Sequence, residues 1–141
     1  MTNQIYPCLW FDGQAKAAAD FYCSVFKNSK ITVDSPMVVN FELNGKKFMG
    51  LNGGAQFKFN EAVSFVVECL DQKEIDYYWD NLTAAGGQES QCGWLKDKFG
   101  VSWQIIPAII GQLMSDPVKG SRVMQVIMKM KKIDLEKLVN A

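Results

Sequence analysis

The fold is decided by residues 62–74, which read AVSFVVECLDQKE. Within this stretch an apolar set alternates with a mixed set, namely Phe65, Val67 and Cys69 against Ser64, Val66 and Glu68. Alternation with a period of two is typical of a β-strand that buries one face. Residues 71–74 (Asp-Gln-Lys-Glu) then have the form of a capping box, which predicts a helix from Gln72. The unit expected here is therefore a strand followed directly by a helix.

The same order of elements occurs in the first third of the chain. Residues 5–11 predict a strand, and Asp12-Gly13 opens a predicted helix with an apolar face formed by Ala15, Ala18, Ala19, Tyr22, Val25 and Phe26. Three short strands are predicted after each helix, at 30–34, 38–43 and 47–51 and again at 88–91, 93–96 and 101–106. Asn44-Gly45 predicts the two-residue turn of a hairpin, and Gly86-Gly87 predicts the end of the second helix.

These patterns predict an α+β fold built from two βαβββ modules. We expect one domain, residues 1–141, with a first module at 1–54, a second at 55–107 and a helical tail at 108–141. Within the tail, helices are predicted at 109–114, 122–130 and 135–139, and Asp116-Pro117 separates the first two.

Composition excludes several classes of function. Fifteen basic residues balance fifteen acidic residues in the 141-residue chain. Such a balance gives no general attraction to nucleic acid or to an anionic membrane, although Lys129, Lys131 and Lys132 form a local basic cluster. No apolar run approaches the roughly 20 residues that cross a bilayer, and no signal peptide is evident, so a cytoplasmic protein is expected. The four widely spaced cysteines are expected to be reduced thiols.

The chain contains no histidine. A divalent catalytic centre usually takes about three protein ligands from His, Cys, Asp and Glu, and histidine is the commonest of them. The sequence therefore disfavours a catalytic metal, and we expect no cofactor.

The mixed strand faces contain the candidate binding residues. If two sheets curve around a common cleft, polar side chains line it together with apolar Leu9 and Phe48; the polar ones are Asn40, Glu42, Asn52, Ser64, Glu68, Ser102 and Gln104. A face exposed to water would show the same alternation, and that alternative stays open. Trp10, Trp79 and Trp103 are expected on the helix-facing sides, in the core.

Several separate motifs carry a family resemblance: residues 10–15 (WFDGQA), 20–22 (DFY), 51–54 (LNGG), 57–62 (FKFNEA), 65–69 (FVVEC) and 92–97 (CGWLKD). In these motifs the chain closely resembles the PhnB-like family, whose members often carry the label 3-demethylubiquinone-9 3-methyltransferase. That family resembles the vicinal oxygen chelate superfamily, which includes glyoxalase I, bleomycin-resistance proteins and extradiol dioxygenases. The resemblance extends to residues 128–132, and the segment between Ser29 and Phe41 is shorter than the family pattern.

The resemblance implies that the paired modules form a curved mixed-sheet cup, as in glyoxalase and bleomycin-resistance proteins, and that the protein is a homodimer. It also locates the superfamily's metal-ligand positions, which here are Pro7, Gly50, Ser64 or a near neighbour, and Gln104. The superfamily's D-x-x-G-x-x-x-E pattern corresponds to residues 97–104, where neutral Gln104 replaces the carboxylate. One amide oxygen cannot hold a transition metal by itself, so no metal site is expected.

The leading hypothesis is a metal-free protein that sequesters or senses a small organic molecule. Its expected ligand-binding residues are Asn52, Ser64, Glu68, Trp94, Ser102 and Gln104, with aromatic contacts from Trp10 and Phe48 as further candidates. Neither a nucleic acid nor a membrane is expected as a partner.

Three alternatives stay open. An enzyme could act by acid–base chemistry through Glu68 or Glu42, or through Cys92 as a nucleophile. The methyltransferase named in the family label would need a site for S-adenosylmethionine, and residues 50–54 are the glycine-rich candidate, without the strand, loop and helix context of nucleotide-like cofactors. Finally, a partner protein could bind the tail methionines, which are Met114, Met124, Met128 and Met130.

Overall fold

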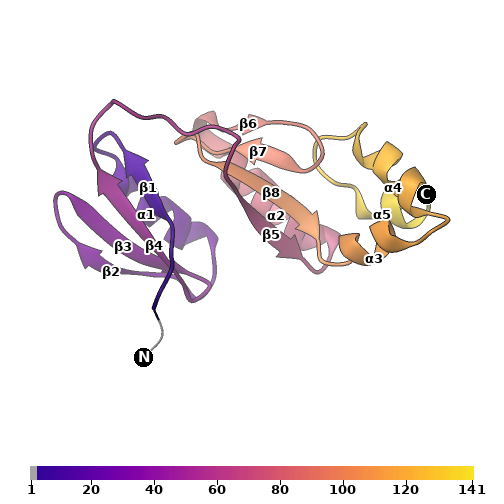
Figure 1. Ribbon diagram of the computed structural model, residues 1–141, viewed down its shortest axis with the longest axis horizontal. Coiled ribbons are helices and arrows are strands. Elements are labelled where there is room, and N and C mark those ends of the chain that lie inside the picture. Colours follow the sequence, from indigo (N-terminus) through magenta and orange to yellow (C-terminus); the bar gives the residue numbers. More distant parts are fainter. Residues whose placement is uncertain (1–2) are drawn as a thin grey trace. The chain divides into compact units, whose positions relative to one another are not determined.

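The computed structural model describes residues 3–141. The chain forms two compact units, one extending to Phe59 and one from Asn60 to Ala141. Within residues 3–141 each unit contains four strands and one long helix, and the second adds three further helices at its C-terminal end, which Figure 1 labels α3, α4 and α5. Each unit is described by itself below.

The first unit follows the predicted order of elements. It contains β1 (Cys8–Phe11), α1 (Ala15–Val25), β2 (Lys30–Asp34), β3 (Val38–Leu43) and β4 (Lys46–Asn52). The sheet order is β1-β4-β3-β2, and β1 runs parallel to β4. Asn44 and Gly45 form the predicted hairpin turn, with φ values of 50° and 78°. The first strand is shorter than the predicted 5–11, because Pro7 lacks an N–H and only its carbonyl joins the ladder, accepting from Met49 N–H.

Helix α1 packs against one face of this sheet. Its buried residues are mainly alanines, and the small side chains let the helix approach the strands closely. A Cβ on Gly50 would lie 3.2 Å from Ala15 Cβ, so a larger residue there would need the helix or the strand to shift by a few tenths of an ångström. The predicted cleft position of Phe48 is wrong: Phe48 pairs with Phe41 in the register and stacks on its ring at 5.4 Å, on the helix side.

The expected positions of two further residues in β1 are also wrong. Leu9 is buried and pairs with Gly50, so it belongs to the helix side and not to a cleft. Trp10, expected in the core, lies on the opposite face and is half-buried. Its Nε1 donates to Gly54 O at 2.8 Å, and its ring meets Phe57 edge-on at 4.9 Å. The alternation of side chains in β1 and β4 was predicted correctly. The two faces were exchanged, so residues expected on the open side of the sheet face the helix, and Trp10, expected to face the helix, lies on the other side.

The second unit repeats the plan, with shorter strands in the two positions that follow its first helix. Its elements are β5 (Ser64–Cys69), α2 (Gln72–Thr83), a 3₁₀ turn (Ala84–Gly86), β6 (Gln88–Glu89), β7 (Trp94–Lys96), β8 (Ser102–Pro107), α3 (Ile110–Ser115), α4 (Gly120–Ile127) and α5 (Leu135–Val139). The sheet order is β5-β8-β7-β6, with β5 parallel to β8. Trp79 and Trp103 are buried, as predicted. The two mixed sheets and short helices confirm the α+β fold class.

The predicted start of α2 is confirmed in detail. The Asp71 carboxylate accepts a hydrogen bond from Glu74 N–H at 2.9 Å. In return, the Glu74 carboxylate accepts from Leu70 N–H at 2.8 Å, one residue earlier than in a standard capping box. The two carboxylates satisfy backbone donors at the start of the helix, where N–H groups have no partner within the helix.

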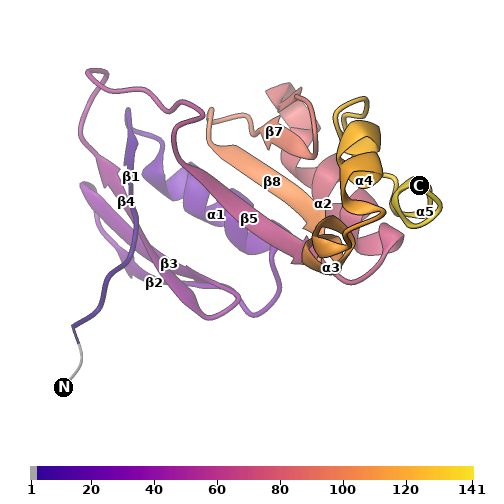
Figure 2. The ribbon, with the colours of Figure 1, turned by 45° about the vertical axis from the view of Figure 1, so that its right-hand side comes forward.

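The tail, residues 108–141, is part of the second unit and forms its C-terminal end (Figure 2). The Gln72 amide joins the start of α2 to the tail: its Nε2 donates to Ile133 O at 2.9 Å, and its Oε1 accepts from Leu135 N–H at 2.8 Å. Ile133 and Leu138 are fully buried. Helix α4 begins and ends earlier than the predicted 122–130. Its early start follows from Asp116, whose carboxylate accepts from the N–H groups of Val118 and Lys119 and begins the helical turn there. No helix within residues 3–141 is long and apolar enough to span a bilayer.

Asp97 organises the turn between β7 and β8. Only 3% of this residue is exposed. Its Oδ1 accepts from the backbone N–H groups of Phe99 (2.8 Å) and Val101 (3.1 Å), and its Oδ2 accepts from Trp103 Nε1 at 2.9 Å. Gly100 completes the turn with φ at +89°. The D-x-x-G part of the resemblance motif therefore builds a turn here.

We expect Asp97→Asn to lower the free energy of unfolding by about 1–3 kcal/mol, because the new amide would direct N–H groups at buried donors. Urea denaturation followed by far-UV circular dichroism would measure the change. The matched control is Asp116→Asn, which alters an exposed carboxylate with two similar backbone bonds and should have a smaller effect. Equal stability of Asp97→Asn and the wild type would contradict this role.

Asn52 joins three segments of the first unit. Its Oδ1 accepts from Ala15 N–H at 2.9 Å and so caps α1, whose own N-cap residue, Gln14, makes no side-chain cap bond. Its Nδ2 donates to Pro36 O at 2.9 Å, in the three-residue connection between β2 and β3. The Asn52 amide is therefore fully engaged in holding the unit together.

Asn52→Ala should lower the free energy of unfolding by about 1–2 kcal/mol, because it removes a helix cap and a second hydrogen bond. Thermal and urea unfolding would measure it. Asn40→Ala is the matched control, since Asn40 Oδ1 is buried without a hydrogen-bond partner among the described residues and its loss should cost less. A larger loss for Asn40→Ala than for Asn52→Ala would refute this assignment.

Candidate functional site

The face of the second sheet opposite α2, called the open face here, brings together most of the predicted binding residues. The strand register places the side chains of this face in three rows across the sheet. The first row contains Ser64, Ser102 and Lys96, the second contains Val66, Gln104 and Trp94, and the third contains Glu68 and Ile106. The intervening residues Leu95, Trp103 and Ile105 are buried on the side of α2. Val66 is 52% exposed, so the open face carries an apolar side chain between its polar groups.

The three polar side chains at the centre of this face differ in their hydrogen bonding. Gln104 Nε2 donates to Ser64 Oγ at 2.8 Å, across the parallel strands. Ser102 is only 1% exposed, yet its Oγ has no hydrogen-bond partner among the described residues. A buried hydroxyl without a partner is costly, by about 1–3 kcal/mol, and such groups are uncommon in native proteins. Ser102 therefore stands out as a hydroxyl available to a bound molecule.

A cavity of about 190 Å³ opens beside Ser102. It is lined by Glu61, Gln88, Glu89, Ser90, Trp94, Leu95, Lys96 and Ser102. Lys96 forms an ion pair with Glu61, and the ammonium group holds the pKa of that exposed carboxyl below its usual range. Trp94 is half-buried and offers an aromatic surface. The cavity thus combines an aromatic ring, charged groups and a hydroxyl without a partner in the part of the chain that the structure describes.

Sequence reasoning found Trp94 and Ser102 but missed the other polar residues of the cavity. Lys96 could have been found, because it follows Trp94 by two positions in one strand and must share its face. The other residues gave no signal: Glu61 lies in the connection before β5, and the remaining three belong to the short β6 hairpin. Their positions follow only from strand pairing.

Other predicted candidates lie elsewhere. Glu68 is exposed on the open face, one row beyond Gln104, and does not line the cavity. Asn52 and Glu42 belong to the first unit, where Asn52 has the structural role described above and Glu42 pairs with Lys47 in the strand register. Cys92 is half-buried in the β6–β7 turn, and its backbone N–H donates to Met130 O at 2.8 Å.

The cysteines are free thiols. Burial raises the pKa of Cys69 to about 12, with smaller contributions from the carboxylates of Glu74 and Asp71. Burial also raises the pKa of Cys8 and of Cys23. Because the thiolate is the reactive form, these three side chains are poor nucleophiles at neutral pH.

The residues at the superfamily's metal positions do not fit a metal ion. Pro7 has no donor atom in its side chain, and Gly50 has no side chain and faces α1. The other two positions, Ser64 and Gln104, are neutral and hydrogen-bonded to each other. Within residues 3–141, no group of three or more Cys, Asp or Glu side chains is arranged to hold a metal. No catalytic step through a metal follows from this donor set.

The glycine-rich segment 50–54 does not fit a nucleotide-like cofactor either. A Cβ on Gly53 would lie 2.2 Å from Trp10 Cζ2, so this glycine makes room for the indole. Gly54 O accepts the hydrogen bond from Trp10 Nε1. No helix begins after these glycines before β5, and their N–H groups therefore do not form the usual anion-binding helix start.

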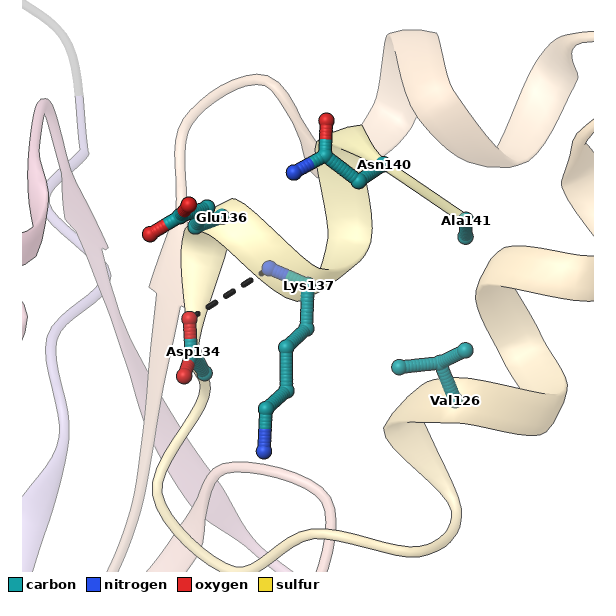
Figure 3. A pocket seen from close by; sticks show the side chains of 6 residues that line it. All are labelled: Val126, Asp134, Glu136, Lys137, Asn140 and Ala141. Atoms are coloured by element: carbon teal, nitrogen blue, oxygen red, sulfur yellow. Dashed lines mark hydrogen bonds between the residues drawn. The ribbon is translucent and has the colours of Figure 1, made fainter.

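Another cavity, of about 580 Å³, lies in the tail between α4 and α5 (Figure 3). It is lined by Val126, Asp134, Glu136, Lys137, Asn140 and Ala141. Asp134 accepts from Lys137 N–H at 3.3 Å and so caps α5. None of these lining residues has a buried side-chain atom without a hydrogen-bond partner, so this cavity lacks the feature that distinguishes Ser102.

Comparisons with known proteins match the first three-quarters of the chain. The sequence model of the family described as 3-demethylubiquinone-9 3-methyltransferase matches residues 3–106. A PhnB protein from Bacillus cereus, which carries the same methyltransferase description, is 32% identical with a TM-score of 0.68, and the alignment covers 75% of this chain and 100% of that chain. The family match ends at residue 106, so the resemblance expected at residues 128–132 lies outside it. No curated protein matches the chain.

More distant structures share the fold. Protein PA1353 from Pseudomonas aeruginosa is 18% identical with a TM-score of 0.63, covering 75% of this chain and 98% of that one. The fosfomycin resistance protein FosX from Listeria monocytogenes is 15% identical with a TM-score of 0.57, covering 80% and 96%. On the sequence match and the similarity to the Bacillus cereus protein together, the chain belongs to the PhnB-like family described as 3-demethylubiquinone-9 3-methyltransferase.

Proposed function

We propose that this protein binds a small organic molecule, without a metal, in the cavity on the open face of the second sheet. The observation that carries the proposal is Ser102 Oγ, which is buried in the cavity wall and has no hydrogen-bond partner among the described residues. A ligand group that bonds this hydroxyl would remove the cost of leaving it unpaired. Trp94 supplies a flat apolar contact beside it.

The cavity volume limits the size of the ligand. At about 190 Å³ it is smaller than the roughly 300–1,000 Å³ typical of sites for drug-sized molecules. The expected ligand is therefore a molecule with a single ring or of similar size. Such small ligands bind weakly, with dissociation constants in the millimolar to micromolar range.

Binding is better supported than catalysis. An acid–base mechanism through Glu68 would place the reacting group outside the cavity, in water. Methyl transfer would need a cofactor site that segment 50–54 does not fit. We therefore infer sequestration or sensing as the role. The free cysteines accord with the reducing cytoplasm, which we propose as its compartment.

We expect Ser102→Ala to leave the melting temperature unchanged or slightly higher, because it removes a buried hydroxyl that has no partner. The same change should weaken binding of benzyl alcohol about fivefold, through loss of one hydrogen bond. The Trp94 indole N–H in ¹⁵N–¹H spectra, assigned with Trp94→Phe, would report the titration.

Ser64→Ala is the matched control for stability, since its hydroxyl accepts the Gln104 bond and its removal should lower the melting temperature. Two results would each contradict the proposed role of Ser102: unchanged affinity in Ser102→Ala, or a loss of stability as large as that of Ser64→Ala.

We further propose that the protein is a homodimer. The motivation is the superfamily resemblance together with large exposed apolar side chains, among them Phe57, Val63 and Val66. Native mass spectrometry of the freshly purified, untagged protein should show twice the chain mass, and an adduct of small organic mass would support the proposed site. A monomer at micromolar concentration would refute the dimer without affecting the cavity.

A further inference from the structure

The side chains that the open face contributes to the cavity are mainly polar. The strand register pairs Gln88 with Lys96, so Gln88 extends the row of Ser102 and Lys96 into β6. Ser90 N–H donates to Trp94 O at 2.9 Å, which continues this pairing and places Ser90 opposite Trp94. Because side chains alternate along a strand, Gln88 and Ser90 share the open face. Trp94 is thus the one large apolar contact that this face gives the cavity.

The charged groups on this face leave no net charge. Lys96 and Glu61 line the cavity and form an ion pair with each other. Glu89 also lines the cavity, but it pairs with Leu95, and its carboxylate accepts from Trp79 Nε1 of α2. The Glu89 charge therefore belongs to the helix side of the sheet. An ionic ligand would find no uncompensated counter-charge here, whereas a neutral ligand can bond to both members of the ion pair while they stay together.

The hydroxyl group is the ligand group that suits this lining best, because it both donates and accepts hydrogen bonds. It can donate to the Glu61 carboxylate and accept from the Lys96 ammonium group. It can do either with Ser102 Oγ, which is buried without a partner among the described residues. An apolar ligand would remove water from these groups and leave them unpaired, which is unfavourable. The lining therefore favours a ligand with several hydroxyl groups.

Trp94 adds a flat surface between polar side chains. The register pairs Trp94 with Gln104 on one side, and Ser90 lies opposite it on the other. A sugar ring has C–H groups on its faces and hydroxyl groups around its rim. One face of such a ring can pack against the indole while the rim hydroxyls bond to the polar groups around it.

We infer that the ligand is a neutral, hydroxyl-rich molecule of the size of one sugar ring. The inference rests on the proposed binding function of the cavity, whose volume of about 190 Å³ limits the ligand to a single ring. One face of the ring packs on Trp94, and one hydroxyl bonds to Ser102 Oγ. Neighbouring hydroxyls bond to the Gln88 amide and to the ion pair of Lys96 and Glu61.

The first test compares neutral sugars with an apolar probe. D-glucose, D-galactose and D-mannose, which differ in the configuration of their hydroxyl groups, and benzyl alcohol would each be titrated into ¹⁵N-labelled protein, with the Trp94 indole N–H as reporter. We expect at least one sugar to bind about fivefold more tightly than benzyl alcohol, because it forms more hydrogen bonds.

The second test asks whether the ligand is neutral. The 2-amino and the 6-carboxylate derivatives of the best-binding sugar would be titrated at a slightly acidic pH, at which both are ionised. Each should bind about threefold more weakly than the neutral sugar, because its charge has no free counter-charge in the cavity. Glu61→Gln frees Lys96 from its ion pair, so this variant should bind the carboxylate derivative about threefold more tightly than the wild type does.

A third test uses Gln88, which a molecule with a single hydroxyl bonded to Ser102 does not need. Gln88→Ala should weaken sugar binding about threefold and leave the affinity for benzyl alcohol unchanged. The matched control is Gln91→Ala, which removes an exposed amide of the β6–β7 turn that is not part of the cavity lining, and it should change neither affinity.

The outcomes separate the inference from the function on which it rests. If benzyl alcohol binds at least as tightly as every sugar, the cavity binds small molecules but the hydroxyl-rich ligand is wrong. If a charged derivative binds as tightly as its neutral parent, or if Gln88→Ala behaves like Gln91→Ala, the inferred recognition of a neutral sugar ring is wrong. If no probe, benzyl alcohol included, shifts the Trp94 signal, the proposed function itself fails.

Discussion

The carboxylate of Asp97 is the contact on which the candidate site depends. By accepting two backbone hydrogen bonds and one indole bond, it fixes the turn that joins β7 to β8. That turn sets the register in which Lys96 is opposite Ser102. Because side chains alternate across a strand, the register decides which residues face α2 and which line the cavity. A slip of one residue would bury the charged side chains and expose the core.

The two units use one topology for different purposes. In the first, Gly50 and Gly53 accommodate Ala15 and the Trp10 indole, and Asn52 caps α1. In the second unit, Gln104 and Ser64 of the open face bond to each other, and the Ser102 hydroxyl has no hydrogen-bond partner among the described residues. Duplication of a βαβββ pattern therefore fixes the sheets and helices, whereas the chemistry of each open face depends on individual side chains.

The family name and the residues point to different chemistry. One structure with the same fold is a fosfomycin resistance protein in complex with Mn(II), at 15% identity to this chain. In this chain the strand positions at which the sequence resemblance would put metal ligands hold a proline, a glycine and a serine–glutamine pair bonded to each other. A shared fold preserves the positions of strand residues but not their donor atoms. The cavity beside Ser102 has an aromatic wall formed by Trp94 and an ion pair between Lys96 and Glu61.

The sequence by itself determined the order of the elements, the capping of α2 by Asp71 and Glu74, the Asn44-Gly45 turn and the family. These features depend on local hydrogen bonds and on periodicity, both of which can be recognised within a few residues. The face of β1 and β4 was assigned wrongly, because short strands with apolar residues on both faces do not fix the phase of burial. The cavity was found only in part: Trp94 and Ser102 were predicted, while Glu61 and Glu89 were not. Only the tertiary structure decided these positions, since the ion pair between Glu61 and Lys96 joins segments distant in sequence, and the folded chain buries the Ser102 hydroxyl without a partner among the described residues.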